Sequence, residues 1–386
     1  MEEVTVLPGV DVLLSDSIHL VRGRRAGLIT NHTGIDALGR PSIDRIMDAR
    51  EVELVSLFSP EHGIRGTERG GDSVESGRDA ATGLPIHSLY GETRAPTPEM
   101  LEGLDIVLFD IQDVGARYYT YVSTMALAMA AAGEAGIPFV VLDRPNPIGG
   151  VAVQGNVLEP EFSTFVGMFP IPMRHGMTPG ELARLFVGEF GVEVELHVVP
   201  VAGWRREMTF SETGLPWVPP SPNMPSVESA LHYPGTCLFE GTNISVGRGT
   251  ERAFQLLGAP WLKGEALVEA LEAYDLPGVG FEAVSFLPRN PGDRKFDGES
   301  VQGVALTASS RDYDPTVTAL ALLLETRRLA GAKWEWRAGH FDRLAGTDDL
   351  RKGIERGSPL DRLREGWARE LEAFQETRAP YLIYLP

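Results

Sequence analysis

This chain of 386 residues has one cysteine, fewer basic than acidic residues, and only short apolar runs. The single cysteine, Cys237, excludes an internal disulfide framework and any metal site built from several cysteines. The 54 acidic residues outnumber the 35 basic ones and give a formal net charge of −19. This excess repels the phosphate backbone, so we expect no nucleic-acid partner. No stretch approaches about 18 uncharged apolar residues, so we expect no membrane partner.

The start of the chain does not resemble a secretory leader. Acidic residues, Glu2 and Glu3, stand where such a leader carries basic ones, and the apolar runs that follow are short. We therefore expect a cytoplasmic protein as the chain stands, or a secreted one if a leader was removed.

Most motifs of reactive sites are also missing. The sequence has no Gly-x-Ser-x-Gly, no Gly-x-x-x-x-Gly-Lys-Ser/Thr and no His-Glu-x-x-His, and no Gly-x-Gly-x-x-Gly follows the first apolar run. These absences argue against a serine hydrolase of the commonest type and against a nucleotide cofactor. We expect no cofactor and no bound metal.

Short apolar runs alternate with amphipathic segments in the first half of the chain. We predict strands at residues 25–30, 52–58, 105–110, 137–142 and 196–200, and helices at 41–50, 119–132 and 178–190. Strands that are rich in Val, Ile and Leu on both faces are typical of a parallel sheet covered by helices on both sides. The predicted fold class is α/β, with a Rossmann-like N-terminal domain.

The second half is less regular and begins after a proline-rich crossing at residues 213–225. This crossing predicts a domain boundary. We expect a Rossmann-like domain at 1–225 that carries most of the active-site loops, and a smaller α+β domain at 226–386 that closes the cleft. The second should contain strands near 236–239, 280–286 and 301–307, helices near 251–257, 264–274 and 314–329, and an amphipathic tail at 362–378.

Polar clusters follow four of the predicted strands. They contain Asn31 and His32, Glu61 and His62, Gln112 and Asp113, and Asp143, Arg144 and Asn146. In open parallel sheets, ligands bind beyond the carboxyl ends of the strands. Four such clusters at one edge therefore predict a polar pocket there.

Two carboxylates suggest the chemistry of this pocket. Glu61 follows Pro60 on a tight turn, and Glu240 lies in a second tight segment in the other half of the chain. Two acids that flank a cleft are what glycoside hydrolysis requires. The alternative for each is a loop carboxylate that accepts backbone N–H bonds. Tyr118 and Tyr119 could stack on a sugar or pack beneath the next helix.

Two other functions stay open at this point. A metal-dependent hydrolase could use His32, Glu61, His62 and Asp110, although these residues lack paired ligand spacing. A non-catalytic sugar-binding protein could present the same polar pocket without turning anything over.

Long motifs in the chain resemble those of the NamZ family of exo-acting β-N-acetylmuramidases, long catalogued as a domain of unknown function. They include Gly-Leu-Ile-Thr-Asn-His-Thr-Gly, Leu-Phe-Ser-Pro-Glu-His-Gly, Leu-Tyr-Gly, Phe-Asp-Ile-Gln-Asp-Val-Gly-Ala-Arg-Tyr-Tyr-Thr-Tyr, Leu-Asp-Arg-Pro-Asn-Pro, Pro-Met-Arg-His-Gly-Met-Thr, Pro-Ser-Pro-Asn-Met-Pro, Phe-Glu-Gly-Thr-Asn-Ile-Ser-Val-Gly-Arg-Gly-Thr and Phe-Asp-Arg-Leu-Ala-Gly-Thr. The resemblance runs from about residue 25 to the C-terminus. It implies release of terminal N-acetylmuramic acid from the non-reducing end of peptidoglycan fragments.

The resemblance also implies roles for particular residues. Glu61 becomes the general acid, and Glu240 an electrostatic stabiliser, a base or an orienter of the 2-acetamido group. The partner implied is a muropeptide or a cell-wall oligosaccharide, and the oligomeric state stays open. Muramic acid carries a lactyl carboxylate, for which Arg117, Arg174 and Arg248 are the expected partners in a locally positive pocket. Further expected substrate-binding residues within the motifs are His175, Asn223 and Asn243.

Overall fold

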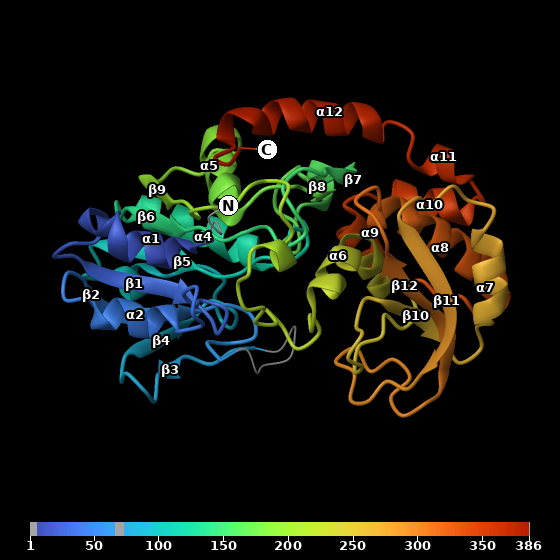
Figure 1. Ribbon diagram of the computed structural model, residues 1–386, viewed down its shortest axis with the longest axis horizontal. Coiled ribbons are helices and arrows are strands. Elements are labelled where there is room, and N and C mark those ends of the chain that lie inside the picture. Colours follow the sequence, from blue (N-terminus) through green and yellow to red (C-terminus); the bar gives the residue numbers. More distant parts are fainter. Residues whose placement is uncertain (1–5, 66–72, 386) are drawn as a thin grey trace.

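The computed structural model of the protein describes residues 6–65 and 73–385, and it has two lobes, each built on its own sheet (Figure 1). The first lobe contains seven strands in the order β3-β4-β2-β1-β5-β6-β9. Their bounds are β1 (Arg25–Thr30), β2 (Glu53–Ser59), β3 (Gly77–Arg78), β4 (Pro85–Ser88), β5 (Ile106–Asp110), β6 (Phe139–Leu142) and β9 (Leu196–Val199). All neighbours pair in parallel except β3 with β4, which confirms the α/β class and the Rossmann-like sheet.

Helices cover both faces of this sheet. Successive strand residues point to opposite faces, so Leu28 belongs to one apolar cluster and Ile29 to the other. The Leu28 cluster packs under α1 (Gly9–Ser15) and α2 (Ser42–Asp48). The Ile29 cluster packs under the longer helices α4 (Tyr121–Glu134) and α5 (Pro179–Glu189), while α3 (Pro98–Leu101) is a single turn before β5. The central strands β1, β5 and β6 are therefore buried on both sides, as their composition requires.

The start of α5 shows how the sequence sets a helix boundary. Thr178 and Glu181 form a capping box at the start of the helix predicted at 178–190, and each side chain accepts the backbone N–H of the other residue. Pro179 occupies the first helical position, where a missing N–H has no cost.

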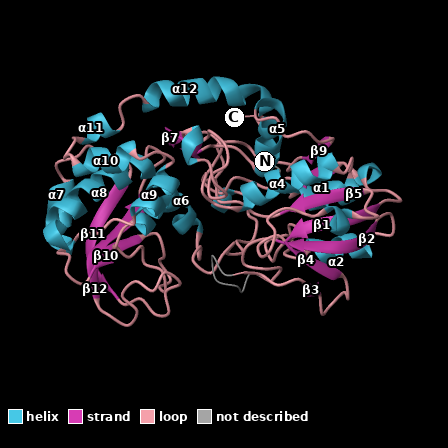
Figure 2. Cartoon of the chain, turned by 180° about the vertical axis from the view of Figure 1, so that it is seen from behind, coloured by secondary structure: helices cyan, strands magenta, loops and turns pink. Residues whose placement is uncertain are grey.

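The second lobe is a three-stranded antiparallel sheet with helices against it. The strand order is β10 (Leu256–Ala259), β12 (Val301–Ala308), β11 (Val279–Phe286). Around it lie α6 (Val227–Thr236), α7 (Gly264–Leu271), α8 (Pro315–Ala330), α9 (Ala338–Ala345), α10 (Asp349–Glu355) and α11 (Leu360–Leu363). A small two-stranded sheet, β7 (Gln154–Val157) and β8 (Pro172–Arg174), lies toward this lobe in Figures 1 and 2.

Two elements predicted for the second half are wrong. The strand expected near 236–239 is the end of α6 followed by a 3-10 helix, η4 (Cys237–Gly241). Gly235 lets α6 lie against α8, because a Cβ at this residue would be 1.9 Å from the carbonyl oxygen of Pro315. The helix expected near 251–257 is a set of turns leading into β10, because residues 256–259 pair with β12. Short apolar runs fit a helix or a strand equally well until a pairing partner is known.

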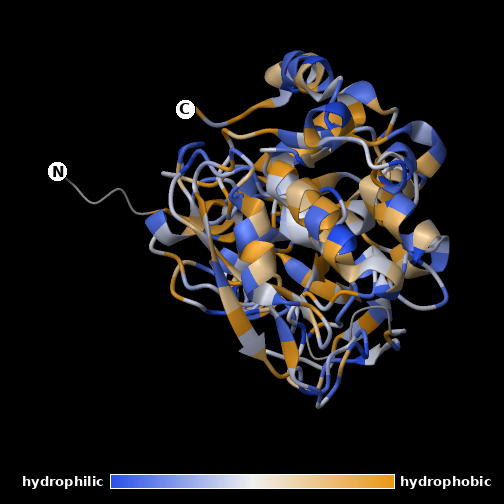
Figure 3. Ribbon diagram, turned by 90° about the vertical axis from the view of Figure 1, so that its right-hand side faces the viewer, coloured by the Kyte–Doolittle hydropathy of each residue, from blue (hydrophilic) through white to orange (hydrophobic). Residues whose placement is uncertain are grey.

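The last helix returns to the first lobe. Helix α12 (Trp367–Arg378) crosses from α11 to α5, and the chain ends beside β9 and α5 (Figures 1 and 2). The domain boundary expected at residue 225 stays a prediction. The sequence did not predict that the C-terminal residues would return to the first lobe. Polar and apolar residues mix along the helices, as amphipathic helices require (Figure 3). Within residues 6–65 and 73–385, no helix combines the length and apolar character needed to cross a bilayer.

Buried polar contacts fasten the returning segment. Arg378 is buried and donates to the carbonyl oxygens of His175 at 3.2 Å and Gly176 at 2.8 Å. The Tyr384 hydroxyl donates to the Asp143 carboxylate at 2.5 Å, at the end of β6. The C-terminal residues therefore complete the polar interior of the first lobe.

We predict that Arg378→Ala lowers the free energy of unfolding by about 2–3 kcal/mol, because several buried carbonyl groups lose a charged donor. Urea unfolding followed by tryptophan fluorescence measures this change. The matched control is Arg369→Ala, on the exposed face of the same helix, which should leave the unfolding midpoint in place. Equal midpoints for the two variants would contradict a fastening role for Arg378.

Candidate active site

A cavity of about 510 Å³ lies where the two lobes meet. Its walls come from the turn after β2, the start of α4, the proline-rich crossing, the region of η4, and α9. The lining residues are Glu61, His62, Tyr90, Arg94, Tyr118, Tyr119, Thr120, Tyr121, Thr164, Phe165, Val166, Ser221, Asn223, Met224, Tyr233, Cys237, Glu240, Arg248, Phe254, His340, Arg343 and Leu344. Both predicted carboxylates therefore face one space.

Glu61 is presented by a strained turn. The N–H of Gly63 donates to the carbonyl oxygen of Pro60 at 3.1 Å, which closes a turn directly after β2. His62 occupies its third position with a φ of 71°, a conformation that costs energy for any residue but glycine. The Thr120 hydroxyl, at the start of α4, donates to Glu61 Oε2 at 2.5 Å. The turn and α4 thus fix this carboxyl group at the carboxyl edge of the sheet.

Glu240 lies across the cavity on η4 and forms an ion pair. Arg248 Nε donates to Glu240 Oε1 at 2.6 Å, and a second guanidinium nitrogen contacts the same oxygen. Burial opposes the charge of Arg248, yet the adjacent Glu240 carboxylate raises the guanidinium pKa. The Cys237 thiol lies 3.9 Å from Glu240 Oε2, and burial raises its pKa, so the sulfur keeps its proton.

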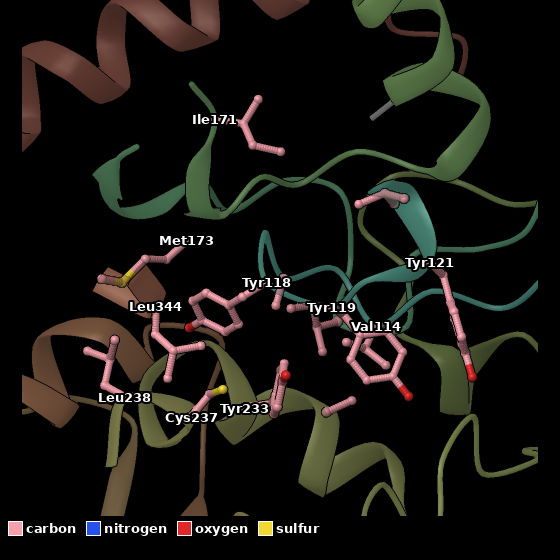
Figure 4. Packing of buried hydrophobic residues seen from close by; sticks show 14 of the residues in the cluster. Val114, Tyr118, Tyr119, Tyr121, Ile171, Met173, Tyr233, Cys237, Leu238 and Leu344 are labelled. Carbon is pink, nitrogen blue, oxygen red and sulfur yellow. The ribbon is translucent and has the colours of Figure 1, made fainter. Parts of the chain in front are cut away.

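Aromatic rings line the floor between the two acids. Tyr118 and Tyr119 both approach Tyr233 edge to face, with ring centroids 5.5 Å and 5.7 Å away (Figure 4). The Tyr118 hydroxyl donates to the carbonyl oxygen of Pro234. Burial raises the pKa of all three phenols, so they stay protonated at neutral pH. These rings offer apolar faces of the kind on which sugars stack.

Several lining residues escaped the sequence analysis. The Arg94 guanidinium lies 4.4 Å from the ring centroid of Tyr90 and 4.1 Å from that of Phe165. His340 and Arg343 both project from α9. Tyr90 and Arg343 lie within Leu-Tyr-Gly and Phe-Asp-Arg-Leu-Ala-Gly-Thr, so a signal was present for those two. Arg94 and Phe165 stand in segments without any pattern.

Most of the strand-end side chains do not face the cavity. Asp110 and Arg144 form a buried ion pair, with Nε to Oδ1 at 2.5 Å and a second nitrogen to Oδ2 at 3.0 Å. Asp143 accepts hydrogen bonds from Thr178 at 2.7 Å and from the N–H of Gly180 at 2.8 Å. Burial raises the Asp143 pKa to about 6, although these hydrogen bonds oppose the shift. Such contacts fix the loops to one another.

Other predicted binding residues serve the same structural purpose. The Asn31 side chain accepts from Thr33, and the Gln112 side chain donates to the carbonyl oxygens of Asp113 and Pro145. The remaining side chains hydrogen-bond to backbone groups: Asn146 to Met177 and Ile148, Asn243 to Lys333 and Glu335, and His32 to Pro219. Only His62, Tyr118, Tyr119, Asn223 and Arg248 of the predicted binding residues line the cavity, beside the two acids.

Arg117 joins the two lobes from a buried position. One guanidinium nitrogen donates to the carbonyl oxygens of Asn156 and Ile171 at 2.8 Å and 2.9 Å, in the first part of the chain. The other donates to Leu344 and Ala345 at 3.2 Å and 2.8 Å, at the end of α9. Burial lowers the Arg117 pKa to about 10, so the group is still charged at neutral pH. Its donors are directed to the backbone, away from any substrate.

Arg174 is likewise buried and does not line the cavity. It donates to Gln154 Oε1 at 2.9 Å and to the carbonyl oxygen of Ile148. Of the three arginines expected to meet a lactyl carboxylate, only Arg248 reaches the cavity, and it is already paired with Glu240.

The residues considered for a metal-dependent hydrolase are not brought together as ligands. Asp110 is held by Arg144 and Ser42, and His32 bonds to the carbonyl oxygen of Pro219 at 2.7 Å. In the described parts of the chain, no three His, Cys, Asp or Glu residues cluster closely enough to hold a metal ion. The geometry therefore does not favour that alternative.

Comparisons with known proteins cover nearly the whole chain. "Exo-beta-N-acetylmuramidase NamZ, N-terminal" matches residues 26–228, and "Exo-beta-N-acetylmuramidase NamZ, C-terminal" matches residues 231–384. The peptidoglycan beta-N-acetylmuramidase NamZ of Bacillus subtilis (strain 168) is 48% identical over 381 residues, which are 98% of this chain and 91% of that protein.

Two crystal structures of DUF1343 family proteins from Bacteroides fragilis NCTC 9343 share the fold. One has a TM-score of 0.92 at 36% identity and covers 99% of both chains. The other has a TM-score of 0.78 at 32% identity and covers 98% of this chain and 99% of its own.

The two-lobed fold and the matches together place the chain among the glycosidases. The matches extend over both lobes and include both acidic motifs. The chain belongs to the NamZ family of exo-β-N-acetylmuramidases.

A buried acid near the site makes stability depend on pH. Burial raises the pKa of Asp113 to about 7, partly offset by the N–H groups of Gly115 and Val114. Nearby His175 has its pKa lowered to about 3 by burial, with Arg378, Arg174 and Arg117 adding to the effect. Because folded Asp113 holds its proton more tightly than the unfolded chain does, its contribution to stability is lost as pH rises through 7.

We predict that Asp113→Asn removes this loss. Between pH 6 and pH 8, the free energy of unfolding of the variant should gain about 1 kcal/mol relative to wild type. Urea titrations across this range measure the difference, with Asp275→Asn, an exposed acid, as the control. Parallel curves for wild type and Asp113→Asn would show that Asp113 is ionised throughout.

Proposed function

We propose that this protein is a glycosidase that releases terminal β-linked N-acetylmuramic acid from the non-reducing end of cell-wall oligosaccharides. The observation that carries the proposal is the placement of Glu61 and Glu240, from different lobes, on one cavity. A peptidoglycan beta-N-acetylmuramidase is 48% identical to this chain over 98% of its length, which supports the substrate class.

Glu61 is the proposed general acid. Its neighbours at the cavity include the hydroxyl groups of Thr120 and Tyr90, and Thr120 donates to its Oε2. These hydroxyls orient the carboxyl group at the cavity. In the reaction, the Glu61 proton moves to the glycosidic oxygen while the bond from that oxygen to the anomeric carbon breaks.

Glu240 is the proposed stabiliser of the positive charge that develops on the sugar. Its ion pair with Arg248 holds the Glu240 side chain at the cavity, where a carboxylate can stabilise a developing cation. Both Arg248 contacts are to Oε1, so Oε2 remains beside the Cys237 thiol for interactions within the cavity. The two acids thus have different surroundings and different roles, as acid–base pairs in active sites require.

The cavity itself suits a single sugar or a short oligosaccharide. Its volume of about 510 Å³ falls within the range for small-molecule sites. Tyr118, Tyr119 and Tyr233 supply apolar ring faces, while Asn223 and Ser221 of the proline-rich crossing supply hydrogen-bonding groups. A water molecule adds its oxygen to the anomeric carbon, and the proton that it releases restores protonated Glu61, which completes hydrolysis.

We predict that Glu61→Gln slows hydrolysis of a MurNAc–GlcNAc disaccharide by about 10²–10⁴-fold. The loss should be much smaller for a nitrophenyl MurNAc glycoside, because its leaving group departs without protonation. Steady-state kinetics with both substrates test this, with Glu228→Gln, exposed on α6, as the control. Equal losses on the two substrates would remove Glu61 from the role of acid.

We predict that Glu240→Gln slows both substrates by the same factor, about 10²–10³-fold, because charge at the anomeric carbon develops whatever the leaving group is. The same assays are run with EDTA in a parallel arm, where the wild-type rate should hold. Full activity of both variants would overturn the site, and an inactive wild type would overturn the function.

A further inference from the structure

Among the residues that the structure describes, positively charged groups outnumber acids at the cavity. Glu61 and Glu240 face three guanidinium groups there, those of Arg94, Arg248 and Arg343. Arg248 is paired with Glu240, whereas Arg94 is exposed and lies between two aromatic rings. Arg343 is half-buried and forms no ion pair with any described acidic residue. A partly desolvated guanidinium without a carboxylate is costly unless a ligand supplies one.

The fold holds Arg343 firmly beside the reaction centre. Gly241 lets η4 pack against α9, since a Cβ at this position would be 2.5 Å from Cα of Phe341. At the other end of α9, Arg117 bonds to the carbonyl oxygens of Leu344 and Ala345. The position of α9 relative to Glu240 is therefore fixed at both ends of the helix.

His340 and Arg343 form one donor surface. They are three residues apart on α9, so they share a face of the helix, and both line the cavity. An arginine nitrogen lies 2.7 Å from His340 Nδ1, which must accept because guanidinium only donates. Neutral His340 therefore carries its proton on Nε2.

The surroundings of His340 and Arg343 determine the charge that each side chain carries. Burial lowers the His340 pKa, Glu240 opposes the shift, and Arg343, Lys295 and Arg337 reinforce it, so the ring is neutral at pH 7. Arg343 Nε is buried and has no hydrogen-bond partner in the described chain. The pair thus offers donors and one positive charge, but no acceptor.

We propose that Arg343 is the specificity-determining residue that binds the lactyl carboxylate of the substrate, with His340 Nε2–H as a second donor. This inference rests on the proposed function, because it concerns the sugar at the same site. A guanidinium with free donors matches a carboxylate in shape and charge. Arg117 and Arg174, the arginines expected from the sequence, are directed to internal acceptors instead.

The test compares a nitrophenyl MurNAc glycoside with its lactyl methylamide, in which an uncharged amide replaces the carboxylate. In wild type, kcat/KM should favour the acid over the amide. In Arg343→Met this preference should fall by about 10- to 100-fold, from the loss of charge-assisted hydrogen bonds, with the amide rate little changed. Arg343→Lys, which keeps the charge but loses the fork, should fall between them.

Arg337→Gln is the matched control. Arg337 is exposed at the start of α9 and does not line the cavity, so this variant removes the same charge nearby without removing a contact. An unchanged preference in Arg343→Met, or an equal loss in Arg337→Gln, would overturn the proposal.

A binding measurement separates this inference from the proposed function. Titration calorimetry with free N-acetylmuramic acid and its methylamide should show the same loss of discrimination in Arg343→Met, whether or not turnover occurs. If wild type binds the acid selectively but hydrolyses neither glycoside, the function fails and the carboxylate receptor stands. If wild type hydrolyses both and Arg343→Met still discriminates in both assays, the receptor fails and the function stands.

Discussion

The buried guanidinium of Arg117 is the contact on which the geometry of the cavity depends. Its donors are shared between carbonyl oxygens of the β7–β8 region and the last carbonyl groups of α9. A cation at the negative end of a helix is favourable, and here it replaces a carboxylate partner. Gly346 permits the approach, because a Cβ there would be 2.9 Å from the guanidinium. Tyr118 follows directly in sequence, so one residue orients both the aromatic floor and the helix with His340 and Arg343.

The charge of the whole protein and the charge of the site have opposite signs. The chain carries a formal net charge of −19, yet of the residues with described positions, three arginines and two glutamates face the cavity. Most of the acidic excess therefore lies elsewhere. An anionic sugar is repelled by the general surface and attracted by this local field, which favours selectivity over rapid capture.

The sequence predicted the sheet better than it predicted the site. Strand positions in the first lobe follow from apolar composition, and helix starts follow from capping residues. Both are local signals, and the start of α5 at Thr178 and Glu181 is the clearest case. Which strand-end side chain points outward depends on neighbours that are distant in sequence. The sequence suggested Asp143 as a binding residue. In the fold, its carboxylate accepts a hydrogen bond from Tyr384, which is more than half the chain away. In the sequence, Arg343 is one polar residue of an amphipathic helix. Its place at the cavity becomes clear only in the fold, where Gly241 allows that helix to pack beside Glu240.

The return of α12 has a consequence for how the protein is made. The first lobe leaves the ribosome early with its sheet complete, but Asp143 and the carbonyl groups of His175 and Gly176 wait for partners near the C-terminus. A nascent chain that stops before Arg378 lacks these buried hydrogen bonds, although Asp143 keeps those from Thr178 and Gly180. The lobe that is synthesised first is therefore completed by the residues that are synthesised last.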